Sequence, residues 1–327
     1  MENDLSIDSS KSVVFVGLAC VDVVNVVQTF PKEDDEHRCL DYFWQRGGNA
    51  SNSSSVFSLL GGRSHFFGTL AGDTDLKELS YLRDDFAKFN VNIERCVVIP
   101  DTFCPTSTVI LNKATGSRTL LSVNKNLPEL KLSDFQDRMD ISSGSVGWIH
   151  FEGRNNAEEI AKMMRFVNDF NASRSPCQRI ITSLEAEKIR LAPGLEMYDM
   201  WKLPDVMFVS KDFAAKQGHT NMETSVMAFH KKLKPGAILI CAWGDKGAAA
   251  MATECGIVTS PAFPPEKVVD TCGAGDTFNA ATIYALSSGR SLKESITFAC
   301  RVAGYKCGIQ GYEGVKNLIC GGELNCN

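Results

Sequence analysis

Short apolar runs rich in β-branched residues alternate along the chain with longer segments in which apolar residues have helical spacing. Runs of this kind, bounded by turn residues, predict buried strands, and the helical segments between them predict crossover connections. The expected strands are Val13 to Leu18, Val146 to Phe151, Ile180 to Leu184, Val206 to Val209 and Ala237 to Trp243. The expected helices are Ala50 to Leu60, Asp75 to Phe89, Ala157 to Phe170, Lys211 to Gln217, Met222 to Leu233, Ala274 to Ser288 and Leu292 to Cys307. This alternation predicts an α/β fold with a mainly parallel central sheet flanked by helices.

Two stretches interrupt the alternation, from about 20 to 46 and from about 96 to 123. In the second, Thr106 to Leu111 and Arg118 to Val123 predict a hairpin around Ala114-Thr115-Gly116. We expect the two stretches to form a small β-sheet lid. The chain contains no internal repeat and no long linker. Residues 1–327 are therefore expected to form one domain, with 1–10 and 316–327 as tails.

Composition narrows the class of protein. The chain has 327 residues, a formal net charge of −5 and no long run of basic residues, which argues against binding to nucleic acid or to an anionic membrane. The longest apolar runs span about seven residues, against roughly 20 for a transmembrane helix. The first ten residues lack the features of a secretory signal. The 12 cysteines are scattered, without a Cys-x-x-Cys pair. We expect a cytoplasmic protein with reduced thiols.

The string Asp270 to Phe278 (DTCGAGDTF) is a glycine-rich turn that leads into a predicted helix. Gly273 and Gly275 leave backbone N–H groups uncovered at the helix N-terminus, where the helix dipole favours an anion. Asp276 then lies where an alcohol would meet a phosphate, and its carboxylate can accept the hydroxyl proton during phosphoryl transfer. The N–H groups of Gly273, Ala274, Gly275 and Asp276 form the expected anion hole. A tight turn with an N-capping aspartate is the alternative.

A second cluster, Trp44 to Asn52 (WQRGGNASN), also places glycines before a helix. Asn49 and Asn52 are one turn apart, so their amides share a helix face and can bind neighbouring sugar hydroxyls. Gly48 precedes them, and Asp22 follows the first strand at the sheet edge where open α/β folds bind ligands. A plain N-cap for Asn49 and a turn-forming role for Asp22 are the alternatives.

Two further features suit a nucleotide. Arg118 beside the hairpin can clamp phosphate oxygens through its guanidinium group, although an arginine there can also be simply solvated. The turn Gly244-Asp245-Lys246-Gly247 follows the strand that ends at Trp243 and can supply backbone contacts, or be an ordinary tight turn. Neither the P-loop pattern nor the protein-kinase signature strings occur.

Gly47 to Asn52 (GGNASN) and Asp270 to Phe278 resemble the two signatures of the ribokinase-like, or pfkB, carbohydrate kinase family, and the resemblance covers roughly residues 12 to 315. Within the family, Gln45-Arg46 before the first signature, His150 to Asn155 (HFEGRN) and Ala262 to Pro265 (AFPP) are similar to the branch that phosphorylates fructose. The resemblance implies a ribokinase-like fold. It also implies ATP-dependent phosphorylation of the C1 hydroxyl of D-fructose, giving fructose 1-phosphate and ADP.

The resemblance also implies roles for individual residues. Asp276 would be the catalytic base, Arg118 and the turn Gly244 to Gly247 would contact the nucleotide, and Phe263 with Pro264 would line the adenine pocket. The sugar would be bound by Asp22, Gly48, Asn49, Asn52 and Asp276. ATP would arrive with magnesium, and potassium is expected near the loop that holds Asp270. The lid would pair with its copy in a second subunit, making a homodimer.

One departure from the family pattern concerns the metal. Many sugar kinases of the superfamily carry Asn-x-x-Glu after a central strand, where this chain has Ser210-Lys211-Asp212-Phe213, so no metal ligand is assigned. Two other functions stay open at this point. One is a kinase for ribose or a nucleoside, although a nucleoside favours a more apolar pocket than Asp22, Asn49 and Asn52 provide. The other is a sensor of sugar or nucleotide that kept the fold without catalysis.

Overall fold

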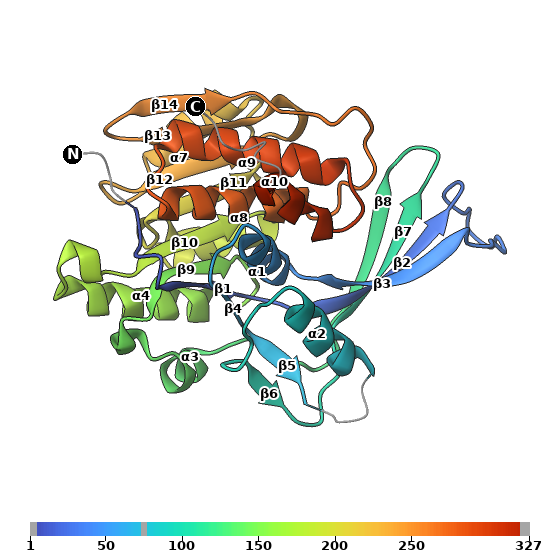
Figure 1. Cartoon of the computed structure of the whole chain (residues 1–327), viewed down its shortest axis with the longest axis horizontal. Coiled ribbons are helices and arrows are strands. Elements are labelled where there is room, and N and C mark those ends of the chain that lie inside the picture. Colours follow the sequence, from blue (N-terminus) through green and yellow to red (C-terminus); the bar gives the residue numbers. More distant parts are fainter. Residues whose placement is uncertain (1–4, 73–76, 321–327) are drawn as a thin grey trace.

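The computed structural model describes residues 5–72 and 77–320, and an eight-stranded sheet forms its centre (Figure 1). Strands from β12 to β4 are parallel, while β13 and β14 are antiparallel at one edge. In spatial order the strands are β14 (Gly256–Ser260), β13 (Ala248–Ala252), β12 (Ile238–Ala242), β11 (Val206–Ser210), β10 (Ile181–Ala186), β9 (Val146–Glu152), β1 (Ser12–Val16) and β4 (Ser64–Phe67). All five predicted strands lie in the parallel part, so the predicted α/β fold is confirmed.

Helices cover both faces of the sheet and bury two separate apolar layers. This burial on both faces explains why β1 and β9 are apolar without alternation. One layer contains α1 (Asn49–Leu59), α2 (Lys77–Lys88), α8 (Ala274–Ser287) and α9 (Leu292–Cys307). The other contains α3 (Leu132–Arg138), α4 (Ala157–Ala172), α5 (Ala192–Met197), α6 (Lys211–Lys216) and α7 (Met222–His230). The sequence did not predict α3 and α5, and the expected start of α2 at Asp75 lies outside the described residues.

Helix α1 is unusual because its polar residues are buried. Its sequence NASNSSSVFSL is rich in serine, which is a moderate helix former. Two of the hydroxyls donate to backbone carbonyls about one turn earlier in the chain: Ser51 to Gly47 at 2.7 Å and Ser54 to Ser51 at 2.6 Å. Small side chains also let α1 approach α8 closely, so that Ser53 donates to the backbone oxygen of Asp276 at 3.2 Å. The helix therefore delivers its polar N-terminal residues to the start of α8.

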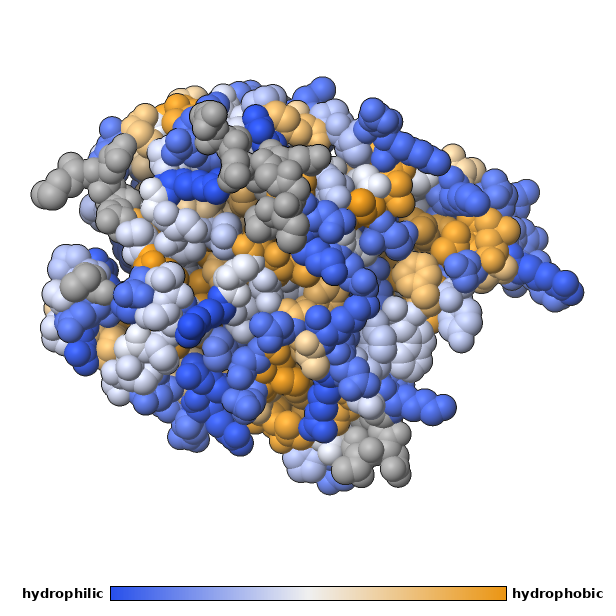
Figure 2. All heavy atoms as spheres, in the orientation of Figure 1, coloured by the Kyte–Doolittle hydropathy of each residue, from blue (hydrophilic) through white to orange (hydrophobic). Residues whose placement is uncertain are grey.

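A four-stranded lid projects from the sheet (Figure 1). Its order is β3 (Asp41–Gly47), β2 (Cys20–Val27), β7 (Thr106–Asn112) and β8 (Arg118–Val123). The predicted hairpin of β7 and β8 is confirmed. Residues 97–99 do not join the lid as expected, because β6 (Val97–Ile99) pairs in parallel with β5 (Thr69–Ala71). Figure 2 shows hydrophobic side chains gathered on the lid, where Leu121 is 61% exposed.

The two ends of the described chain carry more structure than tails would. Ile7 donates its backbone N–H to the Ser287 carbonyl at 2.9 Å. At the other end, α10 (Lys316–Cys320) follows α9, and Leu318 is buried in the core. Of the expected tails, residues 1–4 and 321–327 lie outside the described residues. Within residues 5–72 and 77–320, no helix is both long enough and apolar enough to span a membrane.

Candidate active site

The glycine-rich turn lies at the N-terminus of α8, as the sequence predicted. Gly273 caps the helix in the left-handed conformation, at φ 71°. A Cβ atom on Gly273 would lie 1.7 Å from the hydroxyl oxygen of Tyr312, so only glycine fits there. A Cβ atom on Gly275 would meet no atom within 4 Å. Ala274 donates its N–H to the Thr271 carbonyl at 3.3 Å, whereas among the described residues no backbone partner is recorded for the N–H groups of Gly275 and Asp276. These two donors at the N-terminus of α8 can therefore receive an anion.

Asp276, in the first turn of α8, is 7% exposed and accepts a hydrogen bond from the Asn52 amide at 2.8 Å. Burial raises the pKa of Asp276 to about 8, helped by the charges of Glu187 and Glu152 and opposed by Asn52 and Arg118. The side-chain oxygen of Asn52 is buried and has no hydrogen-bond partner. A buried acceptor without a partner beside a basic carboxylate is suited to a ligand hydroxyl.

Two glutamates near Asp276 were missed by the sequence analysis. Glu185, in β10, accepts hydrogen bonds from Asn279 at 2.8 Å and from Asn49 at 3.1 Å. Glu187, just beyond that strand, accepts from the same Asn49 amide at 2.7 Å. Burial raises the pKa of Glu185 well above its usual value, and the charges of Glu187 and Asp276 raise it further. The rule that selected Asp22, a carboxylate following a strand, would have found both.

The glycine pair before α1 is required by close packing. A Cβ atom on Gly47 would lie 2.4 Å from a carboxylate oxygen of Asp22, and one on Gly48, at φ +98°, would lie 2.1 Å from the Leu18 carbonyl oxygen. Asp22 is in the lid strand β2 rather than in a turn after β1. It is 7% exposed, and burial raises its pKa. Asn49 is the first residue of α1, and Gly48 occupies the N-cap position. The structure thus brings Asp22 next to the start of α1.

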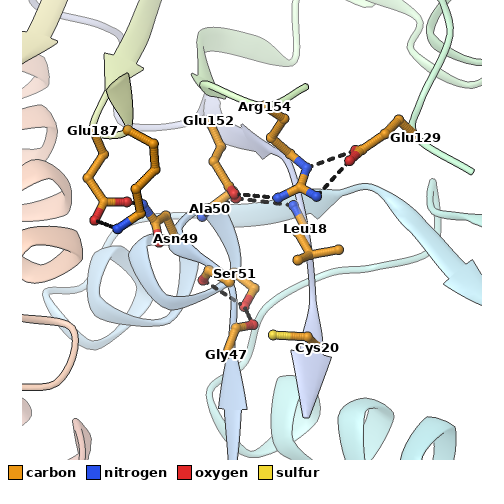
Figure 3. Close-up of polar contacts among 12 residues, drawn as sticks. Leu18, Cys20, Gly47, Asn49, Ala50, Ser51, Glu129, Glu152, Arg154 and Glu187 are labelled. Atoms are coloured by element: carbon orange, nitrogen blue, oxygen red, sulfur yellow. Dashed lines mark hydrogen bonds and ion pairs between the residues drawn. The ribbon is translucent and has the colours of Figure 1, made fainter. Parts of the chain in front are cut away.

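Glu152, at the end of β9, connects the start of α1 with the strand that leads into the lid (Figure 3). One carboxylate oxygen accepts hydrogen bonds from the backbone N–H groups of Leu18, at 3.1 Å, and Ala50, at 3.0 Å. The other accepts from Arg154 at 2.8 Å, and Arg154 also makes two hydrogen bonds, of 2.8 and 2.6 Å, with Glu129. The network fixes the strand entering the lid against the first turn of α1.

Arg118 reaches from the lid to the loop Asp270 to Asp276, which we call the anion loop. It lies at the start of β8, is exposed, and its guanidinium nitrogen lies 3.5 Å from the hydroxyl oxygen of Thr271. Its positive charge lowers the pKa of Asp276 against the effect of burial. The structure therefore brings Arg118 to the loop whose N–H groups were predicted to hold phosphate.

The turn Gly244 to Gly247 follows β12, at the same carboxyl edge of the sheet as Glu152 and Glu185. Gly244, Asp245 and Lys246 form a short 3₁₀ helix, and the side chains of Asp245 and Lys246 are 72% exposed. None of the hydrogen bonds and ion pairs described for residues 5–72 and 77–320 joins this turn to the anion loop. Its predicted contact with a nucleotide stays a prediction.

Two residues from the sequence motifs serve the fold instead. Arg46 is buried, donates to Asp85 at 2.6 Å and to the Ser51 carbonyl at 2.7 Å, and stacks over Phe86. His150 is fully buried, and burial lowers its pKa to about 3. In the parts of the chain that the structure describes, no three metal-ligating side chains form a ready-made metal site.

Comparisons with known proteins agree with this geometry. Residues 10–313 match the pfkB family carbohydrate kinase. The chain is 40% identical to ketohexokinase of Mus musculus over 93% of its length and 99% of the relative. A ribokinase of Arabidopsis thaliana complexed with ribose and ATP has a similar fold, with a TM-score of 0.75 and 18% identity over 97% of this chain and 100% of that chain. A nucleoside kinase of Burkholderia thailandensis in complex with inosine has a TM-score of 0.71 and 16% identity over 93% and 92%.

These matches extend over nearly the whole chain and include both signature strings. The predicted ribokinase-like fold is confirmed by the solved structures. The predicted similarity to one branch of the family is confirmed by the 40% identity to mouse ketohexokinase. The chain belongs to the pfkB family of carbohydrate kinases.

Proposed function

We propose that this kinase transfers the terminal phosphoryl group of ATP to the C1 hydroxyl of D-fructose, giving fructose 1-phosphate and ADP. The observation that carries the proposal is the hydrogen bond from the Asn52 amide nitrogen to Asp276 at the N-terminus of α8, with the buried side-chain oxygen of Asn52 left without a partner. The 40% identity to mouse ketohexokinase supports the choice of sugar.

In the proposed reaction, Asp276 accepts the proton of the attacking hydroxyl as the O–P bond forms and the bond to the leaving ADP oxygen breaks. The N–H groups of Gly273 to Asp276 stabilise negative charge on the transferred group. Arg118 binds the phosphates of ATP from the lid. The turn Gly244 to Gly247 contacts the nucleotide. The sugar lies between the lid and the sheet, against Asp22, Gly48, Asn49 and Asn52.

Magnesium fits the acidic end of this site. Glu185 and Glu187 converge on one amide group, that of Asn49, and their negative charges oppose each other and Asp276. Magnesium prefers hard oxygen ligands and usually takes one or two carboxylates together with nucleotide phosphates and water. Glu185 and Glu187 would hold it, directly or through water. When bound it would neutralise charge on the phosphates.

The test is ADP release by the purified protein with magnesium and ATP, with fructose, tagatose, ribose, adenosine or no acceptor in parallel reactions. Strong release with fructose only, together with a phosphorus NMR spectrum of the product that identifies a C1 rather than a C6 phosphate, is the expected result. Release confined to ribose or adenosine would replace fructose with the alternative substrate. No acceptor-dependent release at all would favour the sensor.

We also propose that the lid forms a homodimer interface. All six residues of β8 are exposed, and Leu120, Leu121 and Val123 are 47%, 61% and 53% exposed. Because β8 is an edge strand of the lid sheet, it also presents unpaired backbone groups. An exposed apolar edge strand is normally covered in a stable protein, and a second copy of the lid offers a matching surface.

A further inference from the structure

Lys306, near the end of α9, is fully buried. A lysine is almost never completely buried unless its charge is paired. The proposed phosphoryl transfer does not use Lys306, and its position in a helix gave no sign of a function. Its surroundings therefore need a separate explanation.

The ammonium group of Lys306 binds two oxygens of one residue. It donates to the Asp270 carboxylate at 2.7 Å and to the Asp270 backbone carbonyl at 2.9 Å. It also lies 5.4 Å from the centre of the Tyr312 ring. Asp270 opens the loop that ends in the anion hole, and its carboxylate also accepts from the backbone N–H groups of Cys272, at 2.8 Å, and Gly311, at 3.1 Å. The buried ammonium group of Lys306 is thus bound directly to the first residue of the anion loop.

Potassium was expected near Asp270, and the residues present do not fit it. A monovalent cation would require the same carboxylate and carbonyl oxygens that Lys306 already binds. A second positive charge within a few ångströms of a buried ammonium group would be repelled strongly at low local dielectric. In this chain the expected place of the ion is taken by a side chain.

We propose that Lys306 is a positioning residue that serves as a built-in monovalent cation for the anion loop. The proposal rests on the proposed phosphoryl transfer. The ammonium group neutralises Asp270, so the loop presents its N–H groups to the phosphates without an uncompensated negative charge nearby. It also joins the loop to the end of α9, where the Val269 N–H donates to the Cys307 carbonyl at 2.8 Å. Tyr312, whose hydroxyl lies against Gly273, completes the support of the loop.

The test uses Lys306→Met, which keeps most of the side-chain volume and removes the charge. The matched control is Lys202→Met, because Lys202 is exposed and pairs with a neighbouring surface aspartate, Asp199. The kcat, the KM for ATP and the thermal midpoint of ligand-free protein are measured in sodium, potassium and ammonium chloride at equal ionic strength.

In sodium, we expect Lys306→Met to lose about 10-fold or more in kcat, less than the roughly 10²- to 10³-fold loss on deleting an oxyanion-hole donor outright. Potassium or ammonium should restore part of that activity and raise the thermal midpoint of the ligand-free variant. Wild type and Lys202→Met should show neither response. The melting experiment contains no substrate, so it tests the cation site even if the proposed reaction is wrong.

Three results would overturn the proposal. The first is a Lys306→Met protein with unchanged kcat in sodium. The second is the same potassium response in wild type and variant, because the ion would then bind elsewhere. If Lys306→Met is not recovered folded, Lys306→Gln, which keeps a donor but not the charge, replaces it. The third result is that neither variant folds in any of the three salts. A potassium or ammonium ion should be able to occupy the position that the lysine ammonium group has left, so at least one variant should fold when such an ion is present.

Discussion

The surroundings of Asp276 suit the catalytic role proposed for it and destabilise its ionised form. Its carboxylate is buried, its hydrogen bond comes from Asn52, and the nearby charges of Glu187 and Glu152 disfavour ionisation. Burying an ionisable group near like charges raises its proton affinity. A carboxylate with a raised pKa is a stronger base toward a sugar hydroxyl than a solvated aspartate.

The first prediction concerns the base itself. Asp276→Asn keeps the shape of the side chain and an oxygen that can accept from Asn52, but it cannot take a proton. We expect kcat to fall by about 10²- to 10⁴-fold, with ATP affinity retained. Steady-state kinetics and nucleotide titration check this. Turnover close to that of wild type would remove Asp276 from the role of base.

The second prediction is a pH dependence. The free protein needs ionised Asp276, so kcat/KM for the sugar should rise with pH up to about 8 and then level off. The free energy of unfolding should instead decrease as the pH rises. Between the usual aspartate pKa and about 8, the folded state holds a proton that the unfolded state has lost, so stability falls as pH rises. Asp276→Asn should fall less steeply over that range in pH-dependent melting, and identical slopes for the two proteins would contradict the raised pKa.

The third prediction separates the two glycines of the anion loop. Gly275→Ala should leave the thermal midpoint equal or higher, because the new methyl group meets no protein atom and alanine favours a helix by up to about 1 kcal/mol. The methyl group should still displace the phosphates and lower kcat/KM by about 10²-fold. Gly273→Ala should instead destabilise the fold, because Tyr312 occupies the space. A Gly275→Ala enzyme with full activity would place the phosphates elsewhere.

At the scale of elements, Glu152 joins β9 to the start of α1 and to the strand entering the lid. The fourth prediction is that Glu152→Gln loses about 1.5–3 kcal/mol of stability. The N–H groups of Leu18 and Ala50 lose a charged acceptor, while Arg154 keeps its pair with Glu129. The substitution should also raise KM for the sugar, since the backbone of Gly48 to Ala50 loses its anchor. Glu129→Gln is the control: it weakens the same arginine pair without touching α1. Chemical denaturation and kinetics on both variants check this, and equal KM values would show that the anchor does not shape the sugar site.

The sequence predicted best those strands and helices whose hydrophobic pattern extends over many consecutive residues. The parallel strands are continuous apolar runs, and α9 begins with Ser291 and Glu294 in a capping box. The prediction failed where the local pattern is ambiguous. The antiparallel strand β13 reads AAAMA, a composition that favours helix, and its strand conformation comes from pairing with β12 and β14.

The same distinction applies to the candidate site. Gly273, Gly275 and Asp276 form one short string, and their mutual position follows from one helix N-terminus. Glu185 and Glu187 follow a predicted strand, so the rule that selected Asp22 also applies to them. That they join this site depends on the strand order, which places the end of β10 beside α1. Lys306 could not be chosen at all, because a lysine in a helix is normally exposed, and only tertiary packing buries it against Asp270.

At the scale of the whole molecule, the lid both supplies Arg118 to the site and carries the exposed apolar strand β8. The fifth prediction is that Leu121→Asp converts a dimer into a monomer, because an isolated charge in the interface cannot be paired. Light scattering after gel filtration checks this. Met197→Asp, at a side chain that is 73% exposed on α5, is the control and should leave the mass unchanged. A wild-type protein that is monomeric at micromolar concentration would contradict the proposed interface.

The support of the anion loop by Tyr312 also bears on how the enzyme comes to exist in the cell. Asp22 lies near the beginning of the chain, whereas the residue that sits beneath Gly273 lies close to its end. During synthesis the strands and the lid that carries Asp22 can fold before the segment with Tyr312 is made. The loop proposed to bind phosphate gains its support only when Tyr312 has emerged, so a polypeptide that stops before Tyr312 should neither bind ATP nor show catalytic activity.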